Sequence, residues 1–198
     1  RQSASKLLSA HPLLTPHALR GSRQRPSPLR RLIFTRGAQG LGKSSVLRAL
    51  NLTPFTLCPD DLRALWGAPV WTDSGRWMVN HNHEAEVWAF LGERLEQRMS
   101  RGELVVVDAT HTYQPGLEGY ARLIERFGYR ALCLDLSQRP LEEALEGNAR
   151  RPWRARVPDR AVERVWAAAR QPRPPSLLDA GCEVLSLPAE GSLEETRD

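Results

Sequence analysis

Lysine is nearly absent from this sequence. Of 28 basic residues in 198, only Lys6 and Lys43 are lysines, and all the others are arginines. Because the chain uses arginine wherever a positive charge suffices, Lys43 indicates a position that needs a compact ammonium group on a flexible stem. Acidic residues are absent before Asp60, and the net charge is +5. This imbalance favours polyanionic partners, namely nucleotide phosphates and nucleic acid.

Cysteine is scarce, and no long hydrophobic segment is present. Cys58, Cys133 and Cys182 have no paired spacing, and the last two lie in apolar runs. We predict buried free thiols there, a pattern typical of a reducing compartment and therefore of a cytoplasmic protein. No apolar stretch approaches the length of a membrane-spanning helix, so no membrane association is expected.

The length and composition predict one α/β domain with a tail on each side. Residues 1–31 contain seven basic residues and no acid. We expect them to be a linker or the end of a preceding domain. Their composition also resembles a transit peptide, but this interpretation ranks second because no initiator Met is visible. The absence of that Met also indicates a fragment. Residues 32–188 are the predicted domain, and residues 189–198 a C-terminal tail.

Short apolar runs alternate with amphipathic helical patterns along this domain. The alternation predicts a parallel sheet with helices on both faces. The expected strands cover residues 32–34, 55–58, 104–107, 129–136 and 182–187. The expected helices start at 45 and 59 and cover 84–101, 114–127, 140–150 and 159–170. In the third helix, one apolar face is predicted to consist of Val87, Trp88, Leu91, Leu95 and Met99. Residues 66–79 are expected to be irregular.

A phosphate-loop motif follows the first apolar run. Residues 37–44 read GAQGLGKS, which is two glycines five positions apart followed by Lys and Ser at a helix start. Glycines let successive backbone N–H groups point at phosphate oxygens. Lys43 would bridge the β and γ phosphates, and the Ser44 hydroxyl would bind Mg²⁺. The pattern predicts a nucleoside triphosphate site, and the alternative is a glycine-rich turn that binds nothing.

Other candidate residues follow the predicted strands. Asp108 ends a buried strand, where it could hold Mg²⁺ beside Ser44 or merely cap the next turn. Asp60 and Arg63 share a face at a helix start. Asp60 could orient an acceptor hydroxyl while Arg63 binds an acceptor phosphate. The alternative is that Asp60 caps the helix and Arg63 is merely solvated. The arginines at 150, 151, 154 and 156 predict either a mobile basic lid or a solvated charge run.

Two further groups carry a weaker signal. His81 and His83 have only Glu84 nearby as another metal ligand, so a metal site is disfavoured. Trp66, Trp71 and Trp77 are candidate stacking faces for bases, with core packing as the alternative.

Taken together, GAQGLGKSS, PDDLR, VVVDATHT and GNARRPWRARVP resemble the kinase domain of the phage and bacterial polynucleotide 5′-hydroxyl kinases that repair nucleic acid ends. The resemblance runs from about residue 32 to 170. It implies a P-loop kinase fold with sheet order 2-3-1-4-5, ATP and Mg²⁺ as cofactors, and a 5′-hydroxyl end of DNA or RNA as substrate. No phosphatase or ligase motif is present, so any such activity would belong to a domain fused N-terminally or to a partner.

The resemblance also implies roles for individual residues. Asp60 would activate the acceptor hydroxyl, and Lys43 and Arg151 would complete the catalytic set. The donor site would consist of Gly37, Gln39, Gly40, Gly42, Lys43, Ser44, Ser45, Arg150 and Arg151. The acceptor site would consist of Asp60, Arg63, Asp108 and Thr110, and the metal would lie at Ser44 and Asp108.

The sequence departs from the family pattern at two places. Gly147 stands before the lid Asn where an Arg is frequent, and the lid is longer, so the choice between Arg150 and Arg151 stays open. His111 replaces the usual Asn after Asp-Ala-Thr. Two rival functions also stay open: a P-loop kinase of a sugar, nucleoside or antibiotic, and a non-catalytic ATP-binding module.

Overall fold

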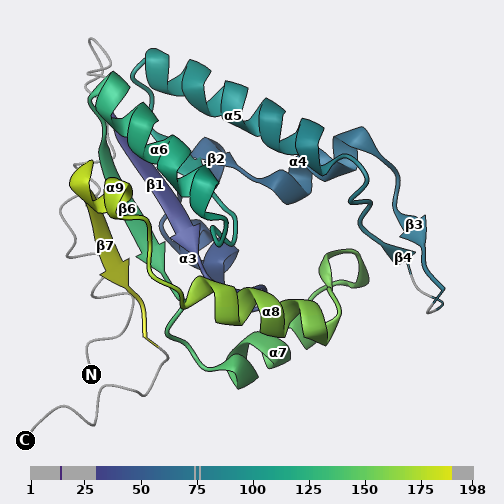
Figure 1. The fold of residues 1–198 in the computed structure, drawn as a ribbon. Helices are drawn as coiled ribbons and strands as arrows, with labels where there is room; N and C mark the ends of the chain where they lie inside the picture. Colours follow the sequence, from purple (N-terminus) through teal and green to yellow (C-terminus); the bar gives the residue numbers. More distant parts are fainter. Residues whose placement is uncertain (1–13, 15–29, 74, 76, 189–198) are drawn as a thin grey trace, which may run out of the picture.

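The computed structural model describes residue 14 and residues 30–73, 75 and 77–188 (Figure 1). The predicted tail 189–198 and nearly all of the predicted linker 1–31 lie outside the described residues. No helix among the described residues is long and apolar enough to cross a membrane.

Five parallel strands form the central sheet. They are β1 (Arg31–Arg36), β2 (Thr56–Leu57), β5 (Val105–Val107), β6 (Arg130–Asp135) and β7 (Cys182–Ser186). Their order across the sheet is β2-β5-β1-β6-β7, and all four pairings are parallel. Counted along the chain, this is the predicted order 2-3-1-4-5. The predicted fold class is therefore confirmed.

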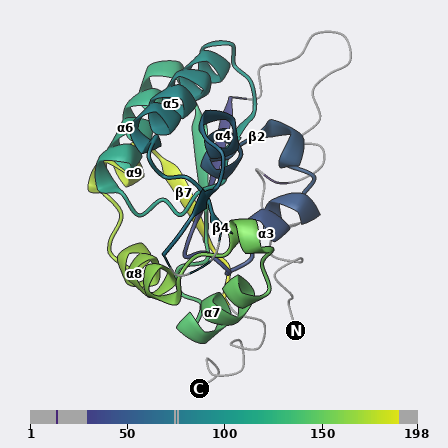
Figure 2. The ribbon, with the colours of Figure 1, turned by 90° about the vertical axis from the view of Figure 1, so that its right-hand side faces the viewer.

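Helices cover both faces of this sheet. They are α3 (Lys43–Ala49), α4 (Pro59–Trp66), α5 (Glu84–Ser100), α6 (Gln114–Phe127), α7 (Leu141–Ala149), α8 (Asp159–Ala169) and α9 (Pro175–Asp179). Figure 2 shows α5 and α6 on one side of the sheet and α3 on the other. The described residues also include two single turns of 3₁₀ helix, η1 (Thr53–Phe55) and η2 (Trp153–Ala155).

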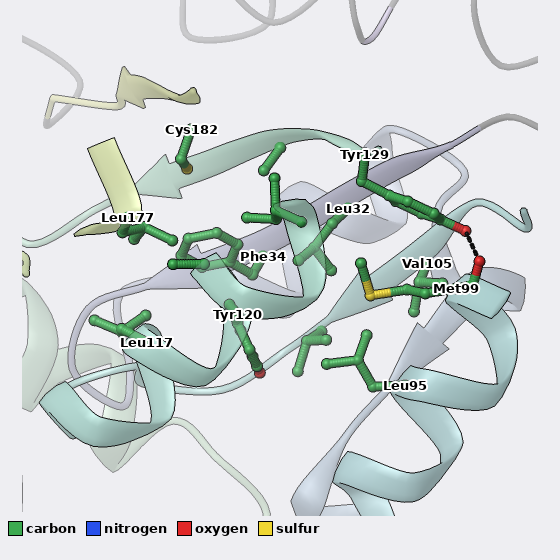
Figure 3. Packing of buried hydrophobic residues seen from close by; sticks show 14 of the residues in the cluster. Leu32, Phe34, Leu95, Met99, Val105, Leu117, Tyr120, Tyr129, Leu177 and Cys182 are labelled. Carbon is green, nitrogen blue, oxygen red and sulfur yellow. Dashed lines mark hydrogen bonds between the residues drawn. The ribbon is translucent and has the colours of Figure 1, made fainter. Parts of the chain in front are cut away.

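Alternate residues of the strands divide the core into two clusters. Leu32 and Phe34 of β1 pack with Leu95 of α5 and Leu117 of α6 (Figure 3). Ile33, between them, joins the opposite cluster with side chains of α3, α7 and α8. Strands buried on both faces favour apolar residues at successive positions, which explains the nearly continuous apolar runs in the sequence.

The structure corrects several local predictions. The Trp88 side chain is 41% exposed, so Trp88 does not belong to the buried face of α5 that Val87, Leu91, Leu95 and Met99 form. Within 66–79, predicted as irregular, β3 (Val70–Trp71) and β4 (Trp77–Met78) pair as an antiparallel hairpin. Helix α9 was not predicted because its pattern is only five residues long. Cys133 and Cys182 are buried free thiols, as expected.

His111 connects the ends of β1 and β5 to α6. Its φ of 49° is left-handed, and its ring is buried. Nδ1 lies 2.5 Å from the Thr35 carbonyl oxygen, and Nε2 lies 3.0 Å from the Tyr120 hydroxyl. Nδ1–H therefore donates to the carbonyl, while Nε2 accepts from the Tyr120 hydroxyl. Burial lowers the pKa of His111 to about 4, so the neutral ring is a structural link at neutral pH.

This link predicts a specific loss of stability in acid. The ordinary pKa of 6.5 applies in the unfolded chain and about 4 in the folded one. The unfolded state therefore gains a proton first, and stability falls as the pH drops from 6.5 through 4. The substitution His111→Asn should reduce the slope of the unfolding free energy, measured with urea, against pH between 6.5 and 4. The exposed control His83→Asn should keep the wild-type slope, and an unchanged slope in His111→Asn would contradict the assignment.

Candidate active site

A pocket of about 770 Å³ lies at the carboxyl edge of the central sheet. The phosphate loop, the start of α4, the segment after β5 and the loop after α7 all contribute to its lining. The following predicted site residues line it: Gln39, Gly40, Gly42, Lys43, Ser44, Ser45, Asp60, Arg63, Asp108, Thr110, Arg150 and Arg151. Parallel strands deliver residues from distant parts of the chain to one edge, which explains the gathering.

Gly37 is the predicted site residue that does not line this pocket. Its φ is +135°, and an added Cβ would lie 3.3 Å from Leu136 and Leu41. Its N–H donates to the Thr110 carbonyl oxygen at 3.2 Å. The glycine therefore serves the packing of the loop against the neighbouring segments. Gly40 and Gly42, at φ of +86° and +84°, supply the turns of the loop that face the pocket.

The Lys43 ammonium group lies inside the phosphate loop. Its Nζ donates a hydrogen bond to the Ala38 carbonyl oxygen at 2.7 Å. Burial, offset only in part by the charge of Asp108, lowers the pKa of Lys43 to about 8. A negatively charged ligand in the loop would favour the charged form and raise that pKa again.

Asp108 joins the phosphate loop to the sheet. One carboxylate oxygen accepts a hydrogen bond from the Ser44 hydroxyl at 2.5 Å, and the other accepts from the Thr35 hydroxyl at 3.0 Å. Asp108 itself is only 8% exposed. Thr35 was not predicted, because a threonine inside an apolar strand gives no sequence signal of its own.

The oxygens of Ser44 and Asp108 suit Mg²⁺. Within the described ranges, no group of three or more His, Cys, Asp or Glu side chains is arranged to hold a metal alone. Mg²⁺ commonly binds one or two protein oxygens together with waters and substrate phosphates, so this small donor set fits. His81 and His83 contact different carboxylates, Glu84 at 2.6 Å and Glu86 at 3.7 Å, so the two rings do not converge on one site.

Asp60 and Arg63 form an ion pair at the start of α4. Arg63 Nη1 lies 2.5 Å from Asp60 Oδ1. The same guanidinium group donates to both carboxylate oxygens of Glu84, from Nε at 2.6 Å and from Nη2 at 2.7 Å. Hydrogen bonds from Arg63 are the main cause that lowers the pKa of Glu84 to about 2. Three of the five N–H groups of Arg63 are thus engaged, and two remain for a ligand.

Glu84 is therefore a positioning residue that the sequence did not reveal. It fixes the guanidinium plane of Arg63 from the first turn of α5. Because 21 residues separate the two, no local spacing pattern connects them. Trp88 Nε1 also donates a hydrogen bond to Glu84 at 3.1 Å. This bond explains why the Trp88 side chain lies at the surface.

The loop after α7 brings Arg151 across the pocket. Its Nη2 lies 3.8 Å from Asp60 Oδ2, and its side chain is 27% exposed. Arg150 instead pairs with Glu146 of its own helix at 3.0 Å and is 75% exposed. Between the two candidate lid arginines, the geometry favours Arg151. The side chain of Arg154 lies outside the description, and Arg156 lines the pocket.

Asn148 forms hydrogen bonds across the base of the loop that follows α7. Its side-chain amide donates to the Val157 carbonyl oxygen at 2.8 Å and accepts from the Val157 N–H at 3.2 Å. Asn148 is fully buried, so these bonds are protected from water. The amide thus joins the two ends of the segment 149–156 that carries the candidate lid arginines.

Gly147 is explained by its contact with the phosphate loop. A Cβ placed on it would lie 2.0 Å from the Gly40 carbonyl oxygen. A Cβ on Gly40 would likewise lie 2.0 Å from the Ala144 carbonyl oxygen. Helix α7 therefore packs backbone to backbone on the loop, which leaves no room for the Arg that is frequent at position 147 in the family suggested by the sequence.

The sheet order and the loop at its carboxyl edge define a P-loop domain of the kinase type. The chain belongs to the AAA domain family (AAA_33), whose model matches residues 32–175. A comparison with curated proteins finds no match.

Solved structures show the same fold at low sequence identity. A chain of the Pnkp1/Rnl/Hen1 RNA repair complex is 18% identical with a TM-score of 0.56, over 70% of this chain and 43% of that one. This chain thus spans less than half of that protein. A putative kinase from Chloroflexus aurantiacus is 16% identical with a TM-score of 0.56, over 85% and 91% of the two chains. Kti12 from Chaetomium thermophilum, in complex with ADP-AlF3, is 16% identical with a TM-score of 0.52, over 78% and 88%.

The contact of α7 with the phosphate loop predicts opposite effects for two helical glycines. Gly147→Ala should destabilise the protein by about 1–3 kcal/mol, since the Gly40 backbone must move. Gly92→Ala is the matched control, because a Cβ on Gly92 of α5 meets nothing within 4 Å. That change should stabilise the helix by up to about 1 kcal/mol. Thermal unfolding measures both, and a stabilised Gly147→Ala variant would contradict the described packing.

Proposed function

We propose that this protein is an ATP-dependent polynucleotide kinase that transfers the γ-phosphoryl group of ATP to the 5′-hydroxyl end of DNA or RNA. One observation carries the proposal. The Asp60 carboxylate, held by Arg63, faces the lid residue Arg151 at 3.8 Å in the pocket that also contains Lys43 and Ser44. A phosphate donor loop, a candidate acceptor carboxylate and a lid arginine thus share one space.

The donor half consists of the phosphate loop. Backbone N–H groups around Gly40 and Gly42 would surround the phosphates of ATP, and the Lys43 ammonium would exchange the Ala38 carbonyl for phosphate oxygens. Ser44 and Asp108 would hold Mg²⁺, which neutralises charge on the phosphates when it is bound. Gln39, Ser45 and Arg150 complete the proposed donor contacts at the rim of the pocket.

The acceptor half consists of Asp60, Arg63 and Thr110, together with Asp108, which it shares with the proposed metal site. The Asp60 side chain is 58% exposed, so a hydroxyl group can approach Oδ2, the oxygen that Arg63 does not hold, align there and pass on its proton. The two unused N–H groups of Arg63 would hold a phosphate of the acceptor's terminal nucleotide. Glu84 keeps that guanidinium group oriented before the acceptor arrives, so less ordering is needed on binding.

Arg151 links the two halves. Its guanidinium group would leave Asp60 for the phosphoryl group in transfer, where charge develops in the transition state. The contact of 3.8 Å is long for an ion pair and is accessible from the pocket, so this exchange costs little.

The chain with the same fold from the Pnkp1/Rnl/Hen1 RNA repair complex was solved together with its partners. By analogy, we propose that the present chain acts with, or is fused to, another end-processing domain, with residues 1–31 as the connection.

Label transfer tests the reaction and its rivals together. The protein is incubated with γ-labelled ATP, Mg²⁺ and an oligonucleotide carrying a 5′-hydroxyl group. Wild type should label the oligonucleotide, and Asp60→Asn should lose about 100-fold or more of the rate, which is the usual contribution of a general base. The exposed control Asp179→Asn should behave as wild type.

Three other outcomes would contradict parts of this account. ATP binding without label on any oligonucleotide would favour a kinase of a small molecule, which the same assay detects with sugars or nucleosides as acceptors. Binding without transfer to any acceptor would favour a non-catalytic module. Full activity in Asp60→Asn would remove this carboxylate from the mechanism.

The lowered pKa of Lys43 predicts proton uptake when ATP binds. In the free protein, Lys43 loses its proton as the pH rises through about 8. Phosphate oxygens favour the ammonium form, so binding near pH 8 should take up a fraction of a proton, and the affinity should fall at higher pH. Calorimetry in buffers of different ionisation enthalpy measures this uptake. Lys43→Met should abolish it, and an enthalpy independent of the buffer in wild type would contradict the prediction.

A further inference from the structure

A second hollow lies beside the active-site pocket, between the β3–β4 hairpin and the lid. Its volume is about 490 Å³, and it is lined by Trp71 and Gly75 of the hairpin segment, Trp77 of β4, Trp153 of η2, and Arg156. We call this hollow the tryptophan groove. The elements that form it are far apart in the sequence, and contacts between β4 and η2 hold them together.

The three tryptophans of this groove are unusually exposed. Trp71, Trp77 and Trp153 are 61%, 47% and 54% exposed. Trp66 is different, because it packs edge-on against Phe90 with 5.2 Å between ring centroids. Of the three tryptophans that the sequence suggested for stacking, Trp66 is therefore a packing residue, whereas Trp71 and Trp77 remain candidates. Trp153 joins them from the lid.

Trp71 and Trp77 leave ring faces for a ligand. Trp71 and Trp77 meet edge to face, with centroids 5.3 Å apart and planes at 71°. In this arrangement the edge of one ring covers one face of the other, and the remaining faces of the pair stay uncovered by it. Exposing this much aromatic surface is unfavourable in water unless a ligand uses it.

The groove is continuous with the acceptor side of the active-site pocket. Arg156 lines both spaces, and Met78, next to Trp77 in β4, lines the active-site pocket. The hairpin follows α4, the helix that carries Asp60 and Arg63, and precedes α5, which carries Glu84. A chain whose end lies at Asp60 can thus continue along the hairpin into the groove.

We propose that the tryptophan groove binds single-stranded nucleic acid by stacking the bases that follow the 5′-terminal nucleotide of the acceptor. This inference rests on the proposed function and extends the acceptor site beyond its first nucleotide. Tryptophan faces stack on any base, and Arg156 supplies positive charge for the phosphates between them. The combination of aromatic rings with an arginine fits a strand of bases and phosphates better than an aliphatic protein surface or a single small metabolite.

The groove therefore makes activity depend on acceptor length. A nucleoside 3′-monophosphate reaches only Asp60 and Arg63, whereas an oligonucleotide of about eight nucleotides also reaches the groove, since single-strand sites span about 4–16 nucleotides. Wild type should have the higher kcat/KM for the oligonucleotide. Trp71→Ala and Trp77→Ala should each lower kcat/KM for the oligonucleotide about tenfold by raising KM. Both variants should keep the wild-type kcat/KM for the nucleoside 3′-monophosphate.

Two control variants accompany these. Trp71→Phe keeps an aromatic face and should retain most of the preference for the oligonucleotide. Phe55→Ala removes an exposed ring before β2, at the opposite end of the sheet, and should change nothing. Equal losses on both acceptors, no loss on either, or equal efficiency of wild type on short and long acceptors would overturn the inference.

Failure of the proposed function would be recognised separately. If wild type phosphorylates neither acceptor, the kinase proposal fails, and the groove is then tested by binding alone. Tryptophan fluorescence should be quenched by a single-stranded oligonucleotide, with about tenfold weaker binding by Trp71→Ala. Quenching of this kind would support binding of nucleic acid in the tryptophan groove even if the kinase proposal fails. Without quenching, the binding proposal would be overturned together with the kinase proposal.

Discussion

The candidate active site depends on the hydrogen bonds that the Asp108 carboxylate accepts from Ser44 and Thr35. Asp108 directly follows β5. Its carboxylate accepts hydrogen bonds from Ser44 at the start of α3 and from Thr35 in β1, and so ties two adjacent strands to the phosphate loop. Loss of either donor would leave a buried carboxylate oxygen without a hydrogen bond, which is unfavourable in free energy. The two hydrogen bonds therefore keep the three segments in one arrangement. His111, three residues later, closes the same junction towards α6. The phosphate loop is therefore oriented by the sheet rather than by its own glycines alone.

The lid is attached to this junction at two levels. The backbones of Gly40 and Gly147 touch, so α7 lies against the phosphate loop, and the buried amide of Asn148 joins the two ends of the arginine-rich loop. Arg151 then reaches Asp60, the proposed acceptor carboxylate. The same loop places Trp153 opposite the β3–β4 hairpin. One short segment thus faces the phosphate loop, the proposed acceptor site and the proposed path of the strand.

Much of the fold was predictable because its signals are local. Continuous apolar runs such as 104–107 identify strands buried on both faces, and the 3.6-residue period identifies α5 and α6. The phosphate-loop spacing predicted Lys43 and Ser44, and the sheet edge predicted Asp108. Contacts between distant segments were not predictable. Nothing in the sequence connects Arg63 with Glu84 or Gly147 with Gly40, and the two-residue strands of the hairpin are too short for a period.

The position of the transferred phosphate tests the central claim most directly. An unlabelled oligonucleotide with hydroxyl groups at both ends is treated with the protein and Mg²⁺-ATP, and the product is sequenced by mass spectrometry. The account predicts one added phosphate, on the 5′-terminal nucleotide. A phosphate at the 3′ end, or an unmodified oligonucleotide with ATP bound to the protein, would contradict it.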